Sequence, residues 1–564
     1  MRPGEAFADL IFSLGMATTC RSARNRLVRA AENPGRVQER TLREILDACR
    51  NTEFGKANKF SSLQSADAFR SAVPIHDYES LRPLIERQIA TGTPSLAPTR
   101  PLLYARTSGT TGLPKLIPVT ERVVDDLKRA QRAMAYAQHD SANAFAGRIL
   151  AIGGPVCEDI LSDGSIAGSI SGLIYKTMPR FVRAKYVLPA EVFAIADHDL
   201  KYAVMARLAV LSTDISTIAT ANPSTILRLL DQIHQDLPTI AREISEGTCT
   251  LLERLPPALA SALKSKIATT PRTRAMELLA SPRTPPTLGE LWPDLRAIVT
   301  WLGGGCAVSA ETVNRLIPAA TKMIDFGYVA SEMRGTIVVD VDRKLALPLL
   351  EDVFFEFVPL ASWNEGSRKT ILVQALEEGR DYHVIVTTFG GLVRYQMNDV
   401  VRAGPSIANT PTFDFVRKGR GVTSLTGEKL SEDQVIAAMT SIGRRIPSPP
   451  SFYVFLAEAD RGGYRAFIEF SGLIDDCKII QTALDEELRT LNIEYASKRA
   501  SGRLKSLTVV PLARGTSNAY RKHCVQKGQR ESQLKVLTLQ NADECDFDFQ
   551  AHILHHDHVT PRLH

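Results

Sequence analysis

A loop rich in glycine and hydroxyl residues, TSGTTGLPK at residues 107–115, has the composition of a phosphate-binding segment. Small residues let backbone N–H groups approach phosphate oxygens, hydroxyls add donors, and Lys115 supplies positive charge at the far end. The spacing is not the G-x-x-x-x-G-K-[ST] of a P-loop, because Leu116 follows the lysine. The candidate phosphate ligands are Ser108, Gly109, Thr110, Thr111, Gly112 and Lys115.

Two downstream segments contain aromatic, hydroxyl or carboxylate residues within a few positions of one another in the sequence. Tyr328, Ser331 and Glu332 follow an apolar run that begins at residue 322, and Asp399 ends the segment RYQMND. A carboxylate contributes two acceptor oxygens to such a site. The pattern Y-x-x-S-E is short enough to arise by chance, so a plain strand end is the alternative interpretation of the first segment.

The elements around the loop are predicted to hold it at the end of a strand. Residues 102–105, LLYA, are typical of a short apolar strand. Thr120 is in position to cap a helix whose apolar residues recur at helical spacing. The sequence therefore predicts strand, loop and helix in this order.

Helical and strand patterns alternate along the rest of the first 400 residues. Residues 41–50 are predicted to form a helix, with Thr41 and Glu44 as a capping box. Helical periodicity dominates from about 190 to 293. Several predicted strands are continuous apolar runs, as strands buried on both faces require. The predicted strands are 148–154, 296–305, 322–328, 352–360, 383–388 and 392–404.

A polar, basic stretch at about 417–427 reads as a connection to a second α/β unit. The elements predicted there are a helix that starts at Ser431 with Gln434, strands at 452–459 and 464–470, a helix at 475–491 and a strand at 504–512. The chain after about residue 540 is expected to be solvated, and five of the 11 histidines crowd it.

The three segments resemble motifs of the acyl-adenylate-forming superfamily, which includes acyl-CoA ligases, nonribosomal peptide adenylation domains and luciferases. TSGTTGLPK is similar to its phosphate loop, YVASE to its aromatic-x-x-[ST]-E element, and RYQMND to its R-Y-R-x-G-D element. The resemblance implies that the ring of Tyr328 lies against adenine, Glu332 helps to hold Mg²⁺, and Asp399 takes both ribose hydroxyls. Asn398 replaces the usual glycine, and asparagine tolerates left-handed backbone.

Six blocks narrow the resemblance to the Gretchen Hagen (auxin-responsive) acyl-acid amido synthetases, in a bacterial-type version. The likeness extends from about residue 40 to about residue 537, and the blocks occur in the family's order. General acyl-CoA ligases lack GEKLSE and the N-x-x-Y-x-x-x-R spacing of Asn492, Tyr495 and Arg499. The blocks are TEFGKANKF, FRSAVPIHDYESL, GLVRYQMNDVV, FVRKGR, GEKLSE and LDEELRTLNIEYASKRASGRL.

Membership of this family implies a two-step reaction with ATP and Mg²⁺. A small carboxylic acid attacks the α-phosphorus of ATP to give acyl-AMP and pyrophosphate, and an amine, usually that of an amino acid, then attacks the acyl carbon. Adenylation is needed because oxide is a poor leaving group, whereas AMP leaves readily. Two alternatives remain open: a ligase that passes the acyl group to the thiol of coenzyme A or of a carrier protein, and a nucleotide-binding protein without turnover.

The family also implies one mobile lysine from the carboxy-terminal part of the chain. The best match to its Q-x-K segment is Gln533, Leu534 and Lys535, although Val-Leu replaces the usual Pro-Arg after the lysine. Lys527 and Lys522 are competitors, and a surface lysine is the alternative for all three.

The amino-acid composition limits the kinds of partner and the cellular location that are expected. The 564 residues include 68 Lys+Arg and 62 Asp+Glu, a net charge of +6, and no basic block is interleaved with aromatic residues, so nucleic acid is not an expected partner. No run of 18 apolar residues occurs, so no membrane span is expected. The eight cysteines lie apart without a C-x-x-C pair, which favours a reducing, cytoplasmic location.

We therefore predict an α/β fold with a large, multi-sheet amino-terminal adenylating domain and a small, mobile α/β carboxy-terminal lid domain. The first domain is predicted to span residues 1–417, followed by a hinge at 418–427, the lid domain at 428–540 and a His-rich tail at 541–564. The predicted catalytic residues are Lys535, Glu332 and Lys115.

Overall fold

The protein is a mixed α/β chain with several sheets, in which two compact units are distinguished by their internal contacts. The larger unit contains residues 1–301 and 313–415, and the smaller contains 302–312 and 416–564. The predicted fold class is confirmed. This computed structural model describes residues 11–107, 115–279, 286–303, 306–419, 421–423, 425–426, 428–474, 476–500, 504–527, 529, 534 and 536–554.

A parallel sheet of the larger unit has the strand order β3-β6-β7-β8. Its strands are β3 (Arg148–Ala151), β6 (Ile215–Ala219), β7 (Ala297–Thr300) and β8 (Lys322–Asp325). Strand β6 was not predicted, because it is short and lies in a stretch with mainly helical periodicity. The hydroxyls of Ser216 and Thr217 donate to the carbonyl of Ala144, which satisfies polar side chains inside the sheet.

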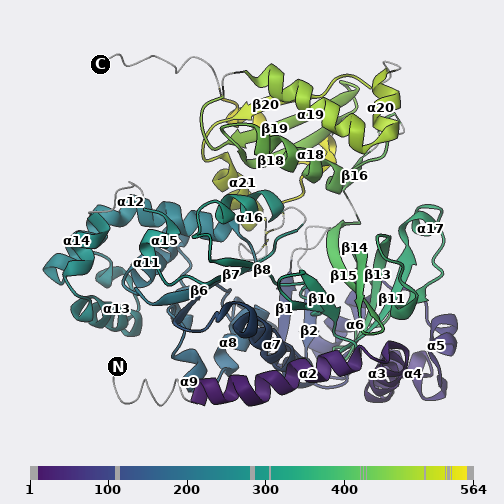
Figure 1. Ribbon diagram of the computed structural model, residues 1–564. Coiled ribbons are helices and arrows are strands. Elements are labelled where there is room, and N and C mark those ends of the chain that lie inside the picture. The colour runs from purple at the N-terminus through teal and green to yellow at the C-terminus, as the bar shows by residue number, and fades with distance from the viewer. Residues whose placement is uncertain are drawn as a thin grey trace. The chain divides into compact units, whose positions relative to one another are not determined.

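Helices account for the rest of the stretch predicted to be helical, and several of them gather beside β6 (Figure 1). Helices α11 and α12 pack against each other, and their apolar side chains share one core with Leu150, Ile218 and Trp292. The helices of this stretch are α10 (Ala190–Phe193), α11 (His198–Val210), α12 (Ser224–Glu246), α13 (Pro257–Thr269), α14 (Thr273–Leu279) and α15 (Leu288–Leu291). Helices α8 (Ile170–Thr177) and α9 (Arg180–Arg183) precede it, and α16 (Ala307–Asn314) follows β7.

A second sheet, in the order β2-β1-β5-β4, contains the predicted strand before the phosphate loop. Thr120 caps α7 (Glu121–Ala142) as predicted, since its hydroxyl accepts from the N–H of Val123 at 3.5 Å. A strand that was not predicted, β2, separates the loop from this helix. The strands are β1 (Leu103–Thr107), β2 (Lys115–Val119), β4 (Asp159–Ile160) and β5 (Ile166–Gly168).

A third sheet has the order β12-β11-β13-β14-β15. The apolar runs of β11 and β13 are buried on both faces, as predicted, and they pair antiparallel to each other. Its strands are β11 (Val353–Pro359), β12 (Ile371–Leu372), β13 (Asp381–Thr388), β14 (Tyr395–Ile407) and β15 (Thr410–Lys418), with α17 (Leu360–Asn364) after β11. An antiparallel hairpin that was not predicted, β9 (Thr336–Asp340) and β10 (Leu345–Pro348), precedes them.

Helices near the amino terminus complete the larger unit, and α2 lies beside α7 (Figure 1). The predicted capping box at Thr41 is wrong, because α3 already begins at Pro34 and Thr41 lies inside it. The Thr41 hydroxyl instead donates to the carbonyl of Leu350 at 2.8 Å. The helices are α2 (Arg21–Ala30), α3 (Pro34–Cys49), α4 (Glu53–Ala57), α5 (Ala66–Ala72) and α6 (Tyr78–Thr91).

The smaller unit contains a four-stranded sheet in the order β20-β19-β18-β21. The helix predicted to start at Ser431 is α18. The backbone N–H of Ser431 donates to Gln434 Oε1 at 3.1 Å. The strands are β16 (Val422–Thr423), β17 (Leu430–Ser431), β18 (Pro450–Glu458), β19 (Gly463–Phe470), β20 (Thr508–Leu512) and β21 (Leu539–Asn541). The helices are α18 (Glu432–Arg445), α19 (Cys477–Leu491), α20 (Ile493–Ala500) and α21 (Thr516–Gln526).

Residues 541–554 are solvated only in part, because aromatic side chains among them pack on the smaller unit. Phe549 is 2% exposed, and its ring stacks against those of Phe467 and Tyr520. Burial of this aromatic residue outweighs the polar composition around it.

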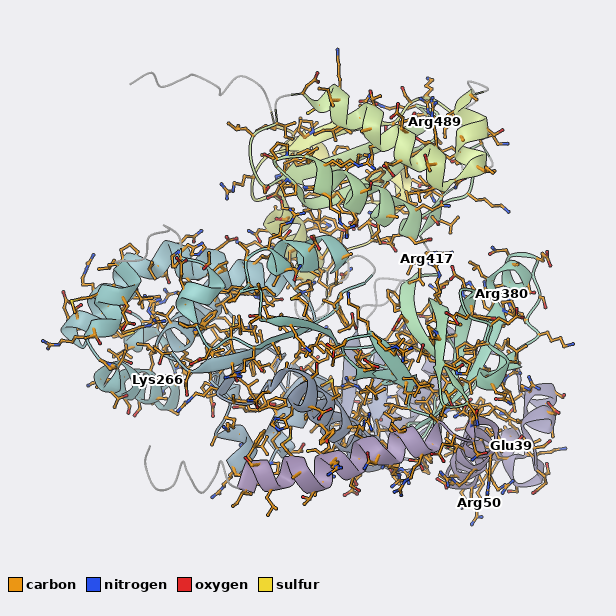
Figure 2. All side chains as sticks on the ribbon, in the orientation of Figure 1. Glu39, Arg50, Lys266, Arg380, Arg417 and Arg489 are labelled. Carbon is orange, nitrogen blue, oxygen red and sulfur yellow. The ribbon has the colours of Figure 1, made fainter. Side chains whose placement is uncertain are left out.

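Charged side chains such as Arg50 and Arg380 project from the surface of the larger unit (Figure 2). Within the described ranges, no helix combines the length and the apolar character that a membrane span requires.

Candidate active site

The predicted phosphate loop connects the two strands of the β1–β2 hairpin. Thr107 at the end of β1 pairs with Lys115 at the start of β2, so the hairpin register fixes where this lysine emerges from the sheet. The other predicted phosphate ligands lie outside the described residues; these are Ser108, Gly109, Thr110, Thr111 and Gly112.

Two tyrosines hold the ammonium group of Lys115. Its Nζ donates to Tyr395 Oη at 3.2 Å and lies 5.4 Å from the ring centroid of Tyr78. The face of an aromatic ring attracts a cation, so both rings favour the charged lysine at this position. Tyr78 is itself fixed, because its Oη accepts from the N–H of Leu116 at 2.6 Å.

Tyr395 links Lys115 to the predicted metal ligand Glu332. Its hydroxyl accepts from Lys115 and donates to Glu332 Oε1 at 3.4 Å. Burial, and after it the negative charge of Glu332, raises the pKa of Tyr395, so its phenol keeps the proton that it donates. The sequence alone indicates no role for Tyr78 or Tyr395, although both lie in the blocks that carry the family resemblance.

Tyr328 and Asp399 form a second contact between predicted site residues. The Tyr328 hydroxyl donates to Asp399 Oδ2 at 2.6 Å, and both side chains are buried. Burial and the nearby carboxylate raise the pKa of Tyr328 well above its usual value, so the phenol remains a donor. The Tyr328 ring stacks on Phe415 at 6.0 Å between centroids, and Glu332 and Tyr395 lie near enough to affect its pKa.

A local irregularity of β14 accompanies the position of Asp399. The pairing of β13 with β14 shifts register between His383 and Ile385, opposite the segment that contains Asn398 and Asp399. Asn398 has a φ of 53°, which confirms the expected left-handed backbone at the position where the family usually has glycine. Such irregularities re-aim side chains next to functional sites.

A buried ion pair fixes the segment before Tyr395. Arg394 Nη2 and Nε donate to the two carboxylate oxygens of Glu356 at 2.8 and 3.0 Å, while Nη1 donates to the carbonyls of Arg70 and Val73. Arg394 is 5% exposed and Glu356 is fully buried. Tyr395, the next residue, contacts Lys115 and Glu332. The Arg394–Glu356 pair therefore fixes the backbone that positions Tyr395, without contacting the site itself.

Replacing Glu356 by alanine is expected to lower the free energy of unfolding by about 3–5 kcal/mol, because it leaves the Arg394 charge buried and unpaired. Glu356→Gln keeps one acceptor and should cost less. Asp381 on the same sheet is the matched control: its partner Arg402 is half exposed, so Asp381→Ala should cost about 1 kcal/mol or less. Urea unfolding of the three variants measures this, and equal losses for Glu356→Ala and Asp381→Ala would contradict the assigned role.

The donor set fits a magnesium ion held partly by its substrate. Mg²⁺ is usually bound by one or two carboxylates together with phosphate oxygens, so a half-buried Glu332 beside Lys115 and Tyr395 suffices. The described ranges contain no group of three or more His, Cys, Asp and Glu side chains arranged to hold a metal. Ser331, the remaining predicted residue of this segment, is buried next to Glu332.

The predicted catalytic Lys535 lies outside the described residues. Its neighbours Leu534 and Val536 pack in an apolar cluster of the smaller unit. The competitor Lys527 forms an ion pair with Asp546, which also contacts His523, whereas Lys522 is exposed on α21. An existing carboxylate partner makes Lys527 the less available of the two.

Comparison with known proteins gives three adjoining matches along the chain. Sequence profiles of the GH3 family match residues 23–323 with the N-terminal domain, 346–418 with the central domain and 433–544 with the C-terminal domain. A solved acyl acid amido synthetase, AtGH3.15 in complex with 2,4-DB, superimposes with a TM-score of 0.84 at 18% identity, covering 95% of this chain and 96% of that one.

Curated plant proteins align over most of the sequence. The indole-3-acetic acid-amido synthetase GH3.2 of Arabidopsis thaliana is 26% identical over 446 residues, which are 73% of this chain and 79% of that protein. The jasmonoyl-L-amino acid synthetase JAR6 of Nicotiana attenuata is 24% identical over 546 residues, covering 90% and 91%. Since the N-terminal match alone takes in more than half of the residues, the chain belongs to the GH3 family of acyl acid amido synthetases.

Proposed function

We propose that the protein is an ATP-dependent acyl acid amido synthetase that joins a small carboxylic acid to the amine of an amino acid through an acyl-AMP. One observation carries the proposal: the contacts Lys115–Tyr395–Glu332 and Tyr328–Asp399 unite three segments that are far apart in the sequence. Together these side chains offer a cation, a metal-binding carboxylate and a diol-binding carboxylate, which suits a nucleoside triphosphate.

In the first step, a carboxylate oxygen of the acid attacks the α-phosphorus of ATP. The new P–O bond forms as the bond to pyrophosphate breaks, so acyl-AMP and pyrophosphate result. Lys115 neutralises phosphate charge, Asp399 orients the ribose, and the Tyr78 and Tyr395 rings keep the ammonium group in place. Positioning and charge neutralisation are the main contributions to phosphoryl chemistry.

Mg²⁺ bound at Glu332 would neutralise the charge of the phosphate oxygens. We further propose that residues 428–540 act as a mobile lid domain, with a hinge at 418–427, and that the lid supplies Lys535 during adenylation. The division of the chain into two compact units, with the carboxy-terminal segment of the smaller unit starting at residue 416, supports a separate domain here.

In the second step, the amine nitrogen attacks the acyl carbon and AMP leaves with its phosphate oxygen. The nitrogen loses a proton, and an amide forms. The names of the plant relatives describe the synthesis of amido and amino acid conjugates, which supports an amino acid rather than a thiol as the acceptor.

We also propose a bacterial-type version of the enzyme that works in the cytoplasm. Identities of 24–26% to the plant proteins support a distant branch of the family, and the eight cysteines spaced singly along the chain suit a reducing compartment.

Lys115→Ala is expected to weaken handling of the triphosphate about tenfold to a hundredfold, because a lost charge-assisted hydrogen bond is worth about 1.5–3 kcal/mol. Thr110→Val should act in the same direction by removing a hydroxyl donor. ATP–pyrophosphate exchange measures both variants. Lys128→Ala removes a half-exposed lysine of α7 that pairs with Asp125, away from the loop, and is the control. Wild-type exchange by Lys115→Ala and Thr110→Val would contradict the assigned phosphate loop.

The acid and the acceptor are identified in two experiments. Hydroxylamine traps any acyl-AMP formed from a mixed panel of acids, and mass spectrometry then compares amino acids with coenzyme A as acceptors. An amide of an amino acid is the expected product. A thioester without amide would replace the proposal with the thiol-ligase alternative.

A further inference from the structure

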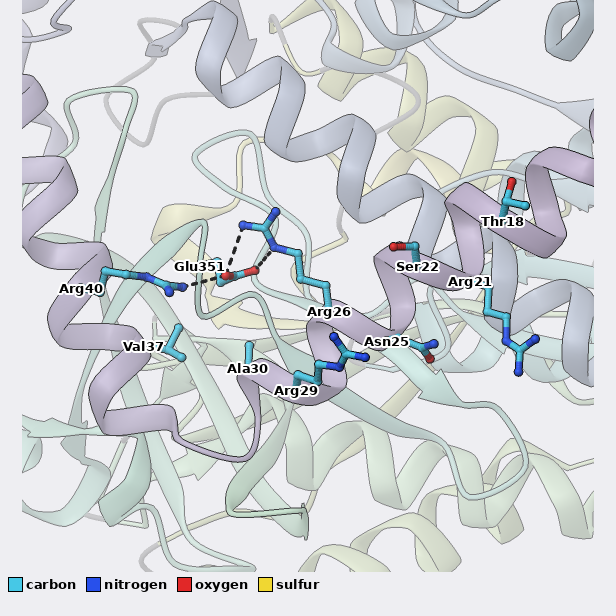
Figure 3. A pocket seen from close by; sticks show the side chains of 10 residues that line it. All are labelled: Thr18, Arg21, Ser22, Asn25, Arg26, Arg29, Ala30, Val37, Arg40 and Glu351. Atoms are coloured by element: carbon cyan, nitrogen blue, oxygen red, sulfur yellow. Dashed lines mark hydrogen bonds and ion pairs between the residues drawn. The ribbon is translucent and has the colours of Figure 1, made fainter.

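A groove of the larger unit lies between α2, α3 and the turn before β11 (Figure 3). Its volume is about 580 Å³, which is in the range of pockets that bind small molecules. The residues of the candidate active site do not line it. Four arginines do, namely Arg21, Arg26, Arg29 and Arg40, together with one carboxylate, Glu351.

Glu351 neutralises only part of this charge. It accepts from Arg26 Nε at 2.6 Å and from Arg40 Nη2 at 2.7 Å, and Figure 3 shows the two guanidinium groups converging on it from α2 and α3. One carboxylate therefore orients two arginines. Four positive charges against one negative charge leave the wall of the groove strongly basic.

Four other polar side chains of the wall are free to bind a ligand. Arg21, Asn25 and Arg29 are spaced by four residues and so lie along one side of α2. Their side chains, and that of Ser22, make no hydrogen bond or ion pair with any residue in the described part of the chain. The groove thus presents guanidinium, amide and hydroxyl donors without matching acceptors.

We propose that this groove binds a small phosphorylated molecule, separately from the ATP site. The guanidinium fork matches two oxygens of one phosphate, and the amide and hydroxyl donors suit the remaining oxygens. A ligand of nucleotide size fits the volume. It contacts Arg21 and Arg29, because Glu351 repels an anion from the Arg26–Arg40 side.

Equilibrium dialysis of the full-length protein against labelled pyrophosphate and labelled AMP tests the proposal. We expect a saturable component that is weakened about tenfold or more in the double variant Arg21→Ala/Arg29→Ala and is unchanged by Lys115→Ala. The control is Arg24→Ala/Arg36→Ala, which removes the same amount of charge, one arginine each from α2 and α3, at positions that do not line the groove. Loss of the component only in Lys115→Ala would overturn the second site.

Two further comparisons distinguish a specific phosphate site from general attraction of anions to a basic surface. Equal weakening in both double variants, or competition by citrate as strong as that by pyrophosphate, would overturn the proposal. Arg21→Lys/Arg29→Lys keeps the charge but loses the fork geometry, so it should bind several-fold more weakly than wild type; wild-type binding would contradict the bidentate contact. Arg21 and Arg29 are exposed and lie outside the candidate active site, so amide formation without added ligand should be the same in the groove variants as in wild type. The dialysis measures binding alone, so its outcome does not depend on the proposed function.

Discussion

Lys535→Ala is expected to abolish adenylation, with a loss of at least about a hundredfold, while sparing the second half-reaction. Negative charge builds up between the attacking carboxylate and the α-phosphate, and a preorganised cation there is worth about 3–4 kcal/mol. No such charge has to be held when an amine attacks a preformed acyl-AMP. ATP–pyrophosphate exchange isolates the first step, and synthetic acyl-AMP with the amine isolates the second.

Lys527→Ala and Lys522→Ala are the matched controls for this experiment. Lys527 already pairs with Asp546, so its loss should affect the local packing of α21 more than exchange. Normal exchange by Lys535→Ala together with loss in either control would assign the role to that other lysine. Normal exchange by all three variants would exclude the lid-lysine mechanism for this protein.

Asp399→Asn is expected to cost about tenfold to a hundredfold in adenylation with ATP. The asparagine keeps one carbonyl oxygen as acceptor for the Tyr328 hydroxyl, so the buried contact survives. Its amide nitrogen, however, cannot accept a hydrogen bond from a ribose hydroxyl. Alanine would be a poorer test, because it leaves the buried phenol without this acceptor and lowers stability as well.

A cycle of protein against nucleotide measures the ribose contact directly. Wild type and Asp399→Asn are each assayed by pyrophosphate exchange with ATP and with 2′-deoxy-ATP. Both changes remove the same interaction, so the effects should be strongly non-additive. Tyr328→Phe, which keeps the carboxylate, should retain discrimination between the two nucleotides. Additive losses would contradict a direct contact between Asp399 and the sugar.

Local signals in the sequence predicted the parts of the fold that depend on nearby residues. The caps at Thr120 and Ser431 and the left-handed Asn398 follow from short-range hydrogen bonding and backbone preference. Thr41 has the same local signal as these caps, but its hydroxyl bonds to Leu350, about 300 residues away, and this tertiary contact overrides the local preference.

Strand β6 could not be predicted in this way. In β6, Ser216 and Thr217 interrupt the apolar run, and their burial is possible only because Ala144 supplies an acceptor. That acceptor comes from a distant segment, so no local pattern predicts it.

The sequence suggested candidate site residues by type but did not predict the contacts between them. Motif order identified Lys115, Glu332 and Asp399, whereas the bridging roles of Tyr78 and Tyr395 depend on how β2, α6 and β14 meet. From the sequence alone, a tyrosine in an apolar segment is interpreted as a core residue. Only its hydroxyl contacts distinguish it from other aromatic residues.

The most direct test of the central claim is product analysis of the purified protein with ATP, Mg²⁺, a panel of small carboxylic acids and a mixture of amino acids. We expect an acyl-amino acid amide, with one AMP and one pyrophosphate formed for each amide, and formation of all three products slowed about tenfold to a hundredfold in Asp399→Asn. Formation of ADP and phosphate in place of AMP and pyrophosphate, or amide formation that does not require ATP, would contradict the acyl-adenylate route.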